Sequence, residues 1–468
     1  MIPVHAFKDR TVAVLGLARS GLSASRALAA GGADVVAWDD AEGARDRARA
    51  LDLRVAAPDA WPWARLAALV LSPGIPLTHP APHPLVARAG AAGIEVIGDI
   101  ELFARAGLPA RVAGVTGTNG KSTTTALLGH LLAAAGVPTQ VGGNLGVPAL
   151  DLAPLGSEGV YVIEMSSYGI DLTRSLDCAV AVLLNITPDH IERHGDFAGY
   201  VAAKHRLFAM QSPGRVAVVG VDDEEGRALE ARLLAEGRRV IPVAVGRKVP
   251  GGVYVVDGAV IDATAGAPVP VADLTGSTTL WGAHNWQNAG AAVAAARSLG
   301  VPAAALAQGL ATFPGLAHRL ELVAEGKGLR FVNDSKATNA DAAARALASF
   351  DTIYWIIGGR PKQGGLAGTE PWWDRVAHAF LIGEAATEFA GQLKGRVGFT
   401  PCGDLATAVD AAAHRAWADR RPGAVVLLSP ACASFDQFRD FEERGAAFRA
   451  LVKDVLARCG GGVRERVA

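Results

Sequence analysis

A strand-like segment that runs into a glycine-rich turn and then into a helix constrains the fold of this chain more than any other feature. The segment is Arg111–Thr116, the turn is Gly117-Thr-Asn-Gly-Lys-Ser122, and helical composition follows over Ala126–Ala135. Glycines let backbone N–H groups approach a phosphate, and a helix N-terminus adds a positive dipole. Lys121 can contact the outer phosphates, and the Ser122 hydroxyl can bind Mg²⁺. The pattern predicts a nucleoside triphosphate site at the end of a strand.

The first glycine of this loop departs from the usual spacing. The common motif has a glycine five residues before Gly120, but that position holds Val115, and the first glycine is Gly117. A glycine-rich turn without a ligand is the alternative interpretation. The Lys-Ser pair in register with a following helix argues against it.

The length and composition of the chain limit how many domains it can form and which kinds of partner it can bind. The chain has 468 residues, which predicts about three domains, and its net charge of −1 favours neither nucleic acid nor an anionic membrane. No apolar run reaches the roughly 18 residues of a membrane span, and the N-terminus lacks the order of a secretion signal. The cysteines show neither metal-site spacing nor a disulfide framework: Cys178, Cys402, Cys432 and Cys459. We therefore expect reduced thiols in a cytoplasmic protein.

Residues 1–98 have the pattern of a Rossmann-like nucleotide-binding domain. Strand signatures at Thr11–Leu15 and Ala33–Trp38 flank the glycine turn Gly16–Gly21 and a helical run, and the second strand ends in Asp39-Asp40. The Gly-x-x-x-x-Gly spacing differs from that of dinucleotide-binding proteins. We expect another nucleotide here, with Asp39 at its sugar or base, and a further ligand contact at the turn Ser72-Pro-Gly74.

Residues 99–315 are predicted to form a central phosphate-loop domain of the ATPase type. Val160–Glu164 and Cys178–Leu184 are continuously apolar and end in polar residues, as is typical of central parallel strands. The carboxyl ends of such strands line the ligand crevice of an open sheet. Glu164 and the turn Asn185–His190 are therefore expected beside the phosphate loop.

Residues 316–468 alternate strands and helices again, which indicates a C-terminal Rossmann-like domain. The predicted strands are Leu329–Val332, Thr352–Ile357, Ala379–Ile382 and Ala424–Leu428. Each is followed by residues typical of turns. The fold class is therefore α/β with three domains.

Motifs in all three segments resemble those of the Mur ligases, which use ATP to add amino acids to peptidoglycan precursors. They are Thr116–Thr123, Glu164-Met-Ser-Ser-Tyr168, Asn185–His190, Lys204, Asn285 with Asn288, and His318-Arg319. Asn333–Asn339 and Ser429–Phe438 resemble members that add D-glutamate to UDP-N-acetylmuramoyl-L-alanine. The resemblance implies an ATP-dependent ligase of cell wall synthesis, hence of cell shape and division, that forms an acyl phosphate. We expect a cytoplasmic monomer with no nucleic acid or membrane partner.

The resemblance also implies the residues of the catalytic centre. Lys121, Glu164, His190 and Lys204 are the catalytic residues it implies, and two Mg²⁺ sites would be formed by Ser122, Glu164, His190 and Lys204. Protonated lysine, with a pKa of about 10.4, would repel Mg²⁺, so Lys204 is implied to carry a carbamate. The implied ATP contacts are Gly117, Thr118, Asn119, Gly120, Lys121, Ser122, Thr123, Asn285, Asn288, Arg319 and Asp334. Asn285 and Asn288 could equally cap a following helix.

Two further sets of residues are implied to bind the other substrates. The UDP-substrate set is Arg19, Ser20, Asp39, Ser72, Gly74, Asn144 and His190. The D-glutamate set is Lys336, Thr338, Lys362, Ser434, Phe435 and Phe441. Asp40 stands where the family often has threonine, and the sequence suggests no role for it.

Three other interpretations are open at this point. A related ligase would add L-alanine, a diamino acid or a dipeptide, or extend folylpolyglutamate; the Asp-Asn-Pro-Arg motif expected of the diamino-acid enzymes is missing. A nicotinamide dehydrogenase would use Gly16–Gly21 and Asp39 but leaves the phosphate loop unexplained. A phosphate-loop switch would hydrolyse ATP without any amino acid.

Overall fold

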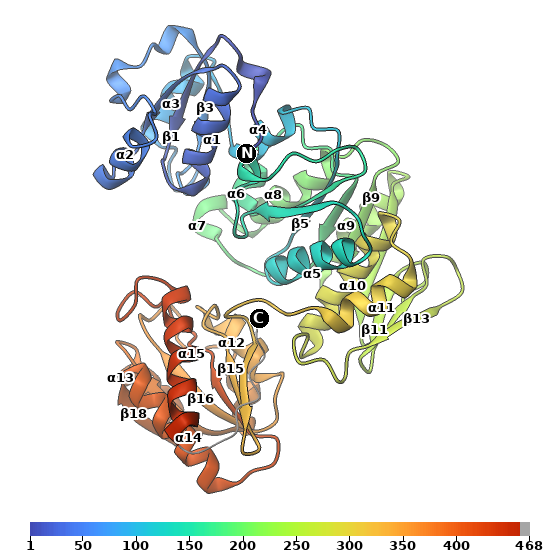
Figure 1. The fold of residues 1–468 in the computed structure, drawn as a ribbon, viewed down its shortest axis with the longest axis vertical. Coiled ribbons are helices and arrows are strands. Elements are labelled where there is room, and N and C mark those ends of the chain that lie inside the picture. The colour runs from blue at the N-terminus through green and yellow to red at the C-terminus, as the bar shows by residue number, and fades with distance from the viewer. Residues whose placement is uncertain (459–468) are drawn as a thin grey trace. The chain divides into compact units, whose positions relative to one another are not determined.

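The computed structural model describes residues 1–458, which form three sheets flanked by helices (Figure 1). The predicted α/β class is confirmed. The chain divides into two compact units: Met1–Asp273 with Gln287–Ala311, and Leu274–Trp286 with the residues from Thr312 onward. The first unit holds two of the sheets and the second holds one. The domain boundaries near residues 98 and 315 stay predictions.

The N-terminal sheet has four parallel strands in the order β2-β1-β3-β4. Alternate residues of β1 pack on opposite faces: Val12 and Val14 join the cluster that contains Leu28, whereas Ala13 and Leu15 join a second cluster. The strands are β1 (Thr11–Leu15), β2 (Asp34–Trp38), β3 (Leu66–Leu71) and β4 (Glu95–Ile97). The helices are α1 (Arg19–Ala30), α2 (Glu42–Arg49), α3 (Pro84–Ala91) and α4 (Asp99–Arg105), with short turns η1 (His5–Phe7), η2 (Pro58–Ala60) and η3 (Trp63–Arg65).

The central sheet places the phosphate-loop strand between the two strands predicted to neighbour it. Its order is β13-β12-β11-β10-β9-β8-β5-β7-β6, parallel from β6 to β11 and antiparallel at β12 and β13. The strands are β5 (Arg111–Thr116), β6 (Thr139–Gly143), β7 (Val160–Glu164), β8 (Val180–Leu183), β9 (Val216–Gly220), β10 (Arg239–Val245), β11 (Val253–Val256), β12 (Ala259–Asp262) and β13 (Val269–Asp273). The carboxyl ends of β5, β7 and β8 therefore lie side by side.

Helices connect the central strands. They are α5 (Lys121–Ala134), α6 (Ser167–Asp171), α7 (Ile191–His194), α8 (Phe197–Ala209), α9 (Glu224–Ala235), α10 (Ala283–Ser298) and α11 (Ala303–Thr312), with the turn η4 (Ala149–Asp151). The helix expected to follow Asn288 already begins at Ala283, after Gly282 at φ +81°. Asn285 and Asn288 thus lie within α10, and the alternative that they precede and cap a helix is wrong.

The third sheet lies in the second unit and has the order β14-β15-β19-β16-β17-β18, with β14 antiparallel and the others parallel. Trp355 and Ile357 of β16 pack on one face, and Tyr354 and Ile356 pack on the other. The strands are β14 (Glu321–Gly326), β15 (Leu329–Asn333), β16 (Ile353–Gly358), β17 (Val376–Ile382), β18 (Phe399–Gly403) and β19 (Val425–Leu428). The helices are α12 (Ala340–Leu347), α13 (Ala386–Leu393), α14 (Leu405–Asp419) and α15 (Phe441–Arg458), with the turn η5 (Glu370–Arg375).

Two expectations from the sequence concern the thiols of the cysteines and the possibility of a membrane-spanning helix. Among residues 1–458, Cys178, Cys402 and Cys432 form no disulfide, and Cys459 lies outside the described residues. In the same part of the chain, none of the helices combines the length and hydrophobicity that a membrane span requires.

Candidate functional site

The loop after β5 has the geometry that phosphate binding requires. Helix α5 begins at Lys121, directly after Gly120, which has φ +85° and so occupies the left-handed region that favours glycine. The Lys121 Nζ donates to the carbonyl oxygens of Gly117 at 3.0 Å and Thr118 at 2.7 Å. The lysine is therefore folded over its own loop, where a phosphate would meet both its charge and the helix N-terminus.

The Asn185–His190 turn lies beside this loop, as predicted. The backbone N–H of Thr118 donates to the carbonyl of Asn185 at 2.8 Å, and the Thr118 hydroxyl donates to the carbonyl of Thr187 at 3.1 Å. Oδ1 of Asn185 accepts from the backbone N–H of Asn119 at 3.0 Å. Asn288 of α10 also contacts the region, because its Oδ1 accepts from the Thr124 hydroxyl at 3.2 Å.

Glu164 ends β7 next to the loop and offers a buried carboxylate oxygen. The side chain is 2 % exposed, and its Oε1 accepts from Asn144 Nδ2 at 2.7 Å. Its Oε2 is buried and has no hydrogen-bond partner among residues 1–458. A buried anionic oxygen without a partner is unfavourable, and a bound cation would satisfy it.

Lys204 is the most deeply buried cation of this region. It lies on α8, is 1 % exposed, and its Nζ donates to the carbonyl of Gly117 at 2.8 Å. Burial, and then the charge of Lys121, lowers the pKa of Lys204 well below its usual value. The neutral amine, which is the form that can add CO₂, is therefore more accessible here than in an exposed lysine.

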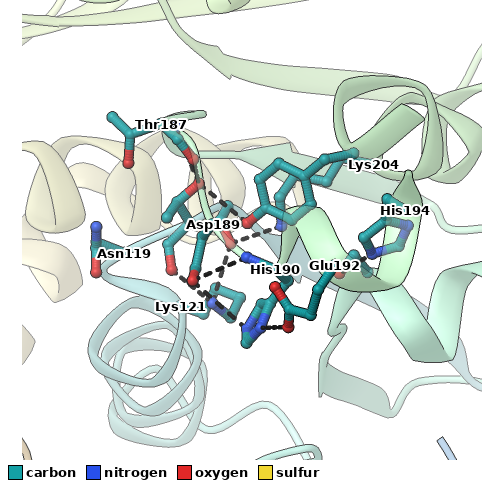
Figure 2. Close-up of polar contacts among 12 residues, drawn as sticks. Asn119, Lys121, Thr187, Asp189, His190, Glu192, His194 and Lys204 are labelled. Atoms are coloured by element: carbon teal, nitrogen blue, oxygen red, sulfur yellow. Dashed lines mark hydrogen bonds and ion pairs between the residues drawn. The ribbon is translucent and has the colours of Figure 1, made fainter. Parts of the chain in front are cut away.

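His190 stands at the start of α7 with φ +53°, an uncommon conformation for a residue other than glycine. Its Nε2 lies 3.5 Å from Asp189 and its Nδ1 lies 3.9 Å from Glu192. Burial lowers the pKa of His190, against the opposing effect of these carboxylates. The side chains of Lys121, Asp189, His190 and Lys204 converge beside the phosphate loop (Figure 2).

The groups gathered here suit a hard cation without forming a complete protein cage. Within the described part of the chain, no three His, Cys, Asp or Glu side chains are arranged to hold a metal ion. Mg²⁺ prefers oxygen ligands and usually keeps several waters and substrate phosphates in its shell. The partnerless Oε2 of Glu164 and the buried hydroxyl of Ser122 fit such an ion.

A cavity of about 600 Å³ in the first unit brings together six of the seven residues predicted for the UDP substrate. These are Arg19, Ser20, Asp39, Ser72, Gly74 and Asn144. Glu164 also lines the cavity, so its wall reaches the end of β7. His190, the seventh residue, is not among the described lining residues.

The structure gives both acids after β2 a local role. Asp39 Oδ2 accepts from the backbone N–H of Leu17 at 2.6 Å, which joins the turns after β1 and β2. Asp40 Oδ1 accepts from the indole N–H of Trp38 at 3.1 Å. Asp40, for which the sequence suggested no role, thus lines the cavity and orients the indole of Trp38.

In the second unit, Asp334 follows β15 and is buried. Its Oδ1 accepts from the backbone N–H of Leu320 at 3.2 Å and its Oδ2 accepts from the Ser429 hydroxyl at 2.9 Å. Burial raises the pKa of Asp334 to about 7. Arg319, beside Leu320, opposes that rise through its charge, so these two predicted ATP contacts are close neighbours.

The structure brings together only some of the residues predicted to bind D-glutamate. The Lys336 Nζ lies 3.8 Å from the centre of the Phe441 ring, and the backbone N–H of Thr338 donates to the carbonyl of Lys336. Ser434 is buried after β19. Lys362 is exposed, and Phe435 is 61 % exposed.

Arg444, which the sequence did not suggest, joins the two loops that carry several of these residues. It is 1 % exposed, and its guanidinium donates to the hydroxyl and carbonyl of Ser335 and to the carbonyls of Cys432 and Ala433. Burial lowers the pKa of Arg444 to about 10. A motif search could not find it, because its acceptors are main-chain atoms and one hydroxyl.

Other residues near the first site were also missed. Tyr200 donates or accepts a hydrogen bond with the Thr118 hydroxyl at 3.1 Å. Arg193 of α7 donates to the carbonyls of Pro73, Gly74 and Ile75, so α7 contacts the turn after β3. Arg193 follows the Asn185–His190 motif by three residues, and the sequence offers no other indication of its role.

Comparisons with known proteins agree with this architecture. The model of the Mur ligase middle domain matches residues 115–296, and that of the Mur ligase glutamate ligase domain matches residues 318–432. The UDP-N-acetylmuramoylalanine–D-glutamate ligase of Rhodospirillum rubrum is 52% identical over 461 residues, 97% of each chain. The protein with the same name in Caulobacter vibrioides is 51% identical over 472 residues, 99% of each chain.

A solved structure shares the fold at low sequence identity. The crystal structure of the UDP-N-acetylmuramate–alanine ligase of Thermotoga maritima superposes with a TM-score of 0.58 at 16% identity, covering 95% of this chain and 99% of that chain. This likeness extends the agreement to the three-domain arrangement of sheets and helices.

Proposed function

The chain belongs to the Mur ligase family, and we propose that it is the ATP-dependent ligase that adds D-glutamate to UDP-N-acetylmuramoyl-L-alanine in peptidoglycan synthesis. The observation that carries the proposal is the identity of 52% to a D-glutamate ligase over 97% of both chains. The site supports it, since a phosphate loop, a buried carboxylate and a large cavity adjoin one another in the first unit.

The cavity is the proposed site for the nucleotide part of the acceptor substrate. Arg19 and Ser20 at the start of α1 would face its phosphates, and Asp39 and the Ser72–Gly74 turn would face its uridine. Asn144 and Glu164 line the same cavity at the end nearest the phosphate loop. The substrate carboxylate would therefore point toward Lys121.

ATP would lie on the phosphate loop. The backbone of Gly117–Gly120 and the start of α5 would surround its β- and γ-phosphates, with Lys121, Ser122 and Thr123 adding side-chain contacts. Asn285 and Asn288 of α10 are proposed to contact adenine, and Arg319 and Asp334 the phosphates and ribose.

Joining a carboxylate to an amine requires activation of the carboxylate. An oxygen of the L-alanyl carboxylate would attack the γ-phosphorus, forming an acyl phosphate as the bond to the ADP oxygen breaks. The D-glutamate amine would then attack the acyl carbon, phosphate would leave, and the nitrogen would lose its proton. Lys121 would stabilise the transferring phosphoryl charge.

Divalent cations are proposed at two positions. Ser122 and Glu164 would hold one, and His190 with carbamylated Lys204 would hold the other. Mg²⁺ supplies charge neutralisation at the phosphoryl group and the reacting carboxylate when it is bound. The lowered pKa of Lys204 supports carbamylation, because only a neutral amine adds CO₂.

The residues of the second unit are proposed to bind D-glutamate. Lys336, Thr338 and Lys362 would meet its two carboxylates, with Ser434 and the backbone at Phe435, while Phe441 packs beside Lys336. Arg444 would keep the two loops in register. We further propose a cytoplasmic monomer, since the nucleotide-linked substrate and ATP are cytoplasmic metabolites.

Phosphate release across a panel of amino acids tests the proposal. Purified protein with ATP, Mg²⁺ and UDP-N-acetylmuramoyl-L-alanine should release phosphate on addition of D-glutamate and yield a product heavier by one glutamyl residue. L-alanine, L-glutamate and diaminopimelate should support at most a small fraction of this rate. Equal rates with L-alanine or diaminopimelate would refute the assignment, and phosphate release without any amino acid would favour an ATPase.

A further inference from the structure

The imidazole of His194 lies at the centre of a hydrogen-bonded chain that the proposed reaction does not use. Its Nδ1 is 3.2 Å from Asp171 Oδ2, and its Nε2 is 2.9 Å from the Ser167 hydroxyl. A carboxylate only accepts, so Nδ1 donates to Asp171, and Nε2 shares a hydrogen bond with the Ser167 hydroxyl. Ser167 and Asp171 are the first and last residues of α6, so His194 ties α7 to α6.

The series Ser167–His194–Asp171 has the same order of hydrogen bonds as the Ser-His-Asp triad of hydrolytic enzymes. A substrate cannot reach it, however. Ser167 is 3 % exposed and His194 is 9 % exposed. The neighbouring Ser166 lines the large cavity, whereas Ser167 is not among the described lining residues. The Ser167 hydroxyl therefore orients the ring and does not serve as a nucleophile.

Two tyrosine rings contact the His194 ring and connect it to the candidate metal ligands. Tyr168 stacks on His194 at 5.6 Å and 19°, and the same tyrosine lies 5.0 Å from the His190 ring. Tyr200 lies 5.4 Å from His194, and the Lys204 Nζ sits 4.6 Å from the centre of the Tyr200 ring. Through these two tyrosine rings, His194 is linked by contacts to both His190 and Lys204.

The backbone between His190 and His194 makes such an anchor necessary. Helix α7 has four residues, bounded by His190 at φ +53° and Gly195 at φ +85°. A residue other than glycine keeps a left-handed conformation only where its surroundings hold it. The ring of His194 and the three main-chain contacts of Arg193 anchor the chain on the carboxyl side of His190.

We propose that His194, oriented by Asp171 and Ser167, is a positioning residue that holds His190 and Lys204 in the geometry that binds the divalent cation. The inference rests on the proposed function, because that function makes His190 and Lys204 the cation ligands. Groups that orient metal ligands typically change metal affinity or activity 10- to 100-fold, so the effect should be measurable.

Binding of Mn²⁺, followed by the electron paramagnetic resonance signal of the free ion, tests the proposal without turnover. In the presence of a non-hydrolysable ATP analogue, His194→Phe and Asp171→Asn should bind Mn²⁺ about 10-fold or more weakly than the wild type. Ser167→Ala should change affinity in the same direction by less. In the ligase assay, the Mg²⁺ concentration for half-maximal rate should rise in parallel, while the KM for D-glutamate stays within about twofold of the wild type.

His205→Phe is the matched control. His205 follows Lys204 on α8, but it lines a groove with Phe197 and Arg232, and its Nε2 has no hydrogen-bond partner in the region that the structure describes. This variant should bind Mn²⁺ as the wild type does. An equal loss in His205→Phe would mean that any change on α8 disturbs the site, which would overturn the role of His194.

Two further outcomes separate the inference from its alternatives. Should His194→Phe fail to fold, Asp171→Asn and Ser167→Ala keep the ring and carry the test. Unchanged Mn²⁺ affinity in these folded variants, with only a lower melting temperature, would show a purely structural role and overturn the proposal. If the wild type made no product with D-glutamate but the Mn²⁺ losses were observed, the proposed function would fail and the positioning role would stand.

Discussion

Asn144 Nδ2 donates a 2.7 Å hydrogen bond to Oε1 of Glu164, while Oε2 of the same buried carboxylate has no hydrogen-bond partner among the described residues. The amide fixes the orientation of the carboxylate and leaves one oxygen available. Without a cation, burying that charge is costly. If Glu164 holds a cation as proposed, removing its charge should not destabilise the ligand-free protein.

Glu164→Gln removes the charge and keeps an acceptor for Asn144. We expect the ligation rate to fall about 100-fold or more, because charge stabilisation at the transferring phosphoryl group is lost. The ligand-free variant should melt at the same temperature as the wild type or higher, and Mg²⁺ with ATP should raise its melting temperature less. Thermal scanning with and without Mg²⁺-ATP measures both effects. The exposed Glu158→Gln is the control; equal stabilisation of Glu164→Gln and wild type by Mg²⁺-ATP would contradict the prediction.

A comparison of Gly120→Ala with Gly136→Ala separates two effects of an added Cβ, which are backbone strain and steric blockage of the phosphate loop. Gly120 has φ +85°, and an added Cβ would collide with the side chain of Asn288. Gly136, just after α5, has φ +79° and no described atom within 4 Å of an added Cβ. Both variants should lose about 1–2 kcal/mol of unfolding free energy from left-handed strain. Only Gly120→Ala should lose ATP affinity, by about 10-fold or more, in calorimetric titration; a similar loss in Gly136→Ala would attribute it to strain.

Lys204→Met should stabilise the protein in buffer depleted of CO₂, in a manner that depends on pH. The pKa of Lys204 is lowered in the folded state, so the unfolded chain binds the additional proton up to its own pKa of about 10.4. Stability therefore rises with pH in this window. The advantage of Lys204→Met in urea midpoint should be largest near neutral pH and shrink toward about pH 10. The exposed Lys248→Met should show no such trend.

For Asp334→Asn in the second unit, the stability advantage over the wild type should change with pH in the opposite direction. Its pKa is raised to about 7 in the folded state, so the folded chain keeps a proton that the unfolded chain releases at about pH 4. Wild-type stability falls as pH rises through this window. Relative to wild type, Asp334→Asn should gain stability between about pH 4 and 7 and then level off, as judged by urea unfolding at a series of pH values. The exposed Asp374→Asn is the control, and a flat difference for Asp334→Asn would contradict the raised pKa.

The strands that could be predicted from sequence are those whose residues are apolar throughout. Val160–Glu164 and Thr11–Leu15 match β7 and β1 residue for residue, because both faces of a central parallel strand are covered. Edge strands do not carry this pattern. In β13 and β18 most residues are exposed or half-buried, and both strands contain proline, so neither was recognised.

The residues of the candidate site also fall into two groups, those that could be predicted from sequence and those that could not. Lys121, Glu164 and His190 could be proposed because each belongs to a short contiguous motif at a strand end. The contacts of Arg444 join residues 109 positions apart, and those of His194 with Ser167 join residues 27 apart. Such pairs depend on how helices pack, and a single sequence does not specify that packing in any local pattern.

Arg193 contacts the turn after β3 through the carbonyl oxygens of Pro73, Gly74 and Ile75, all of them main-chain atoms. Main-chain carbonyls are present whatever the side chain, so this interaction constrains the path of the turn and leaves its composition free. The side chains of this turn can therefore be replaced without loss of the three hydrogen bonds from Arg193. An arginine of this kind lets one part of an enzyme diversify without altering how it is attached to the rest.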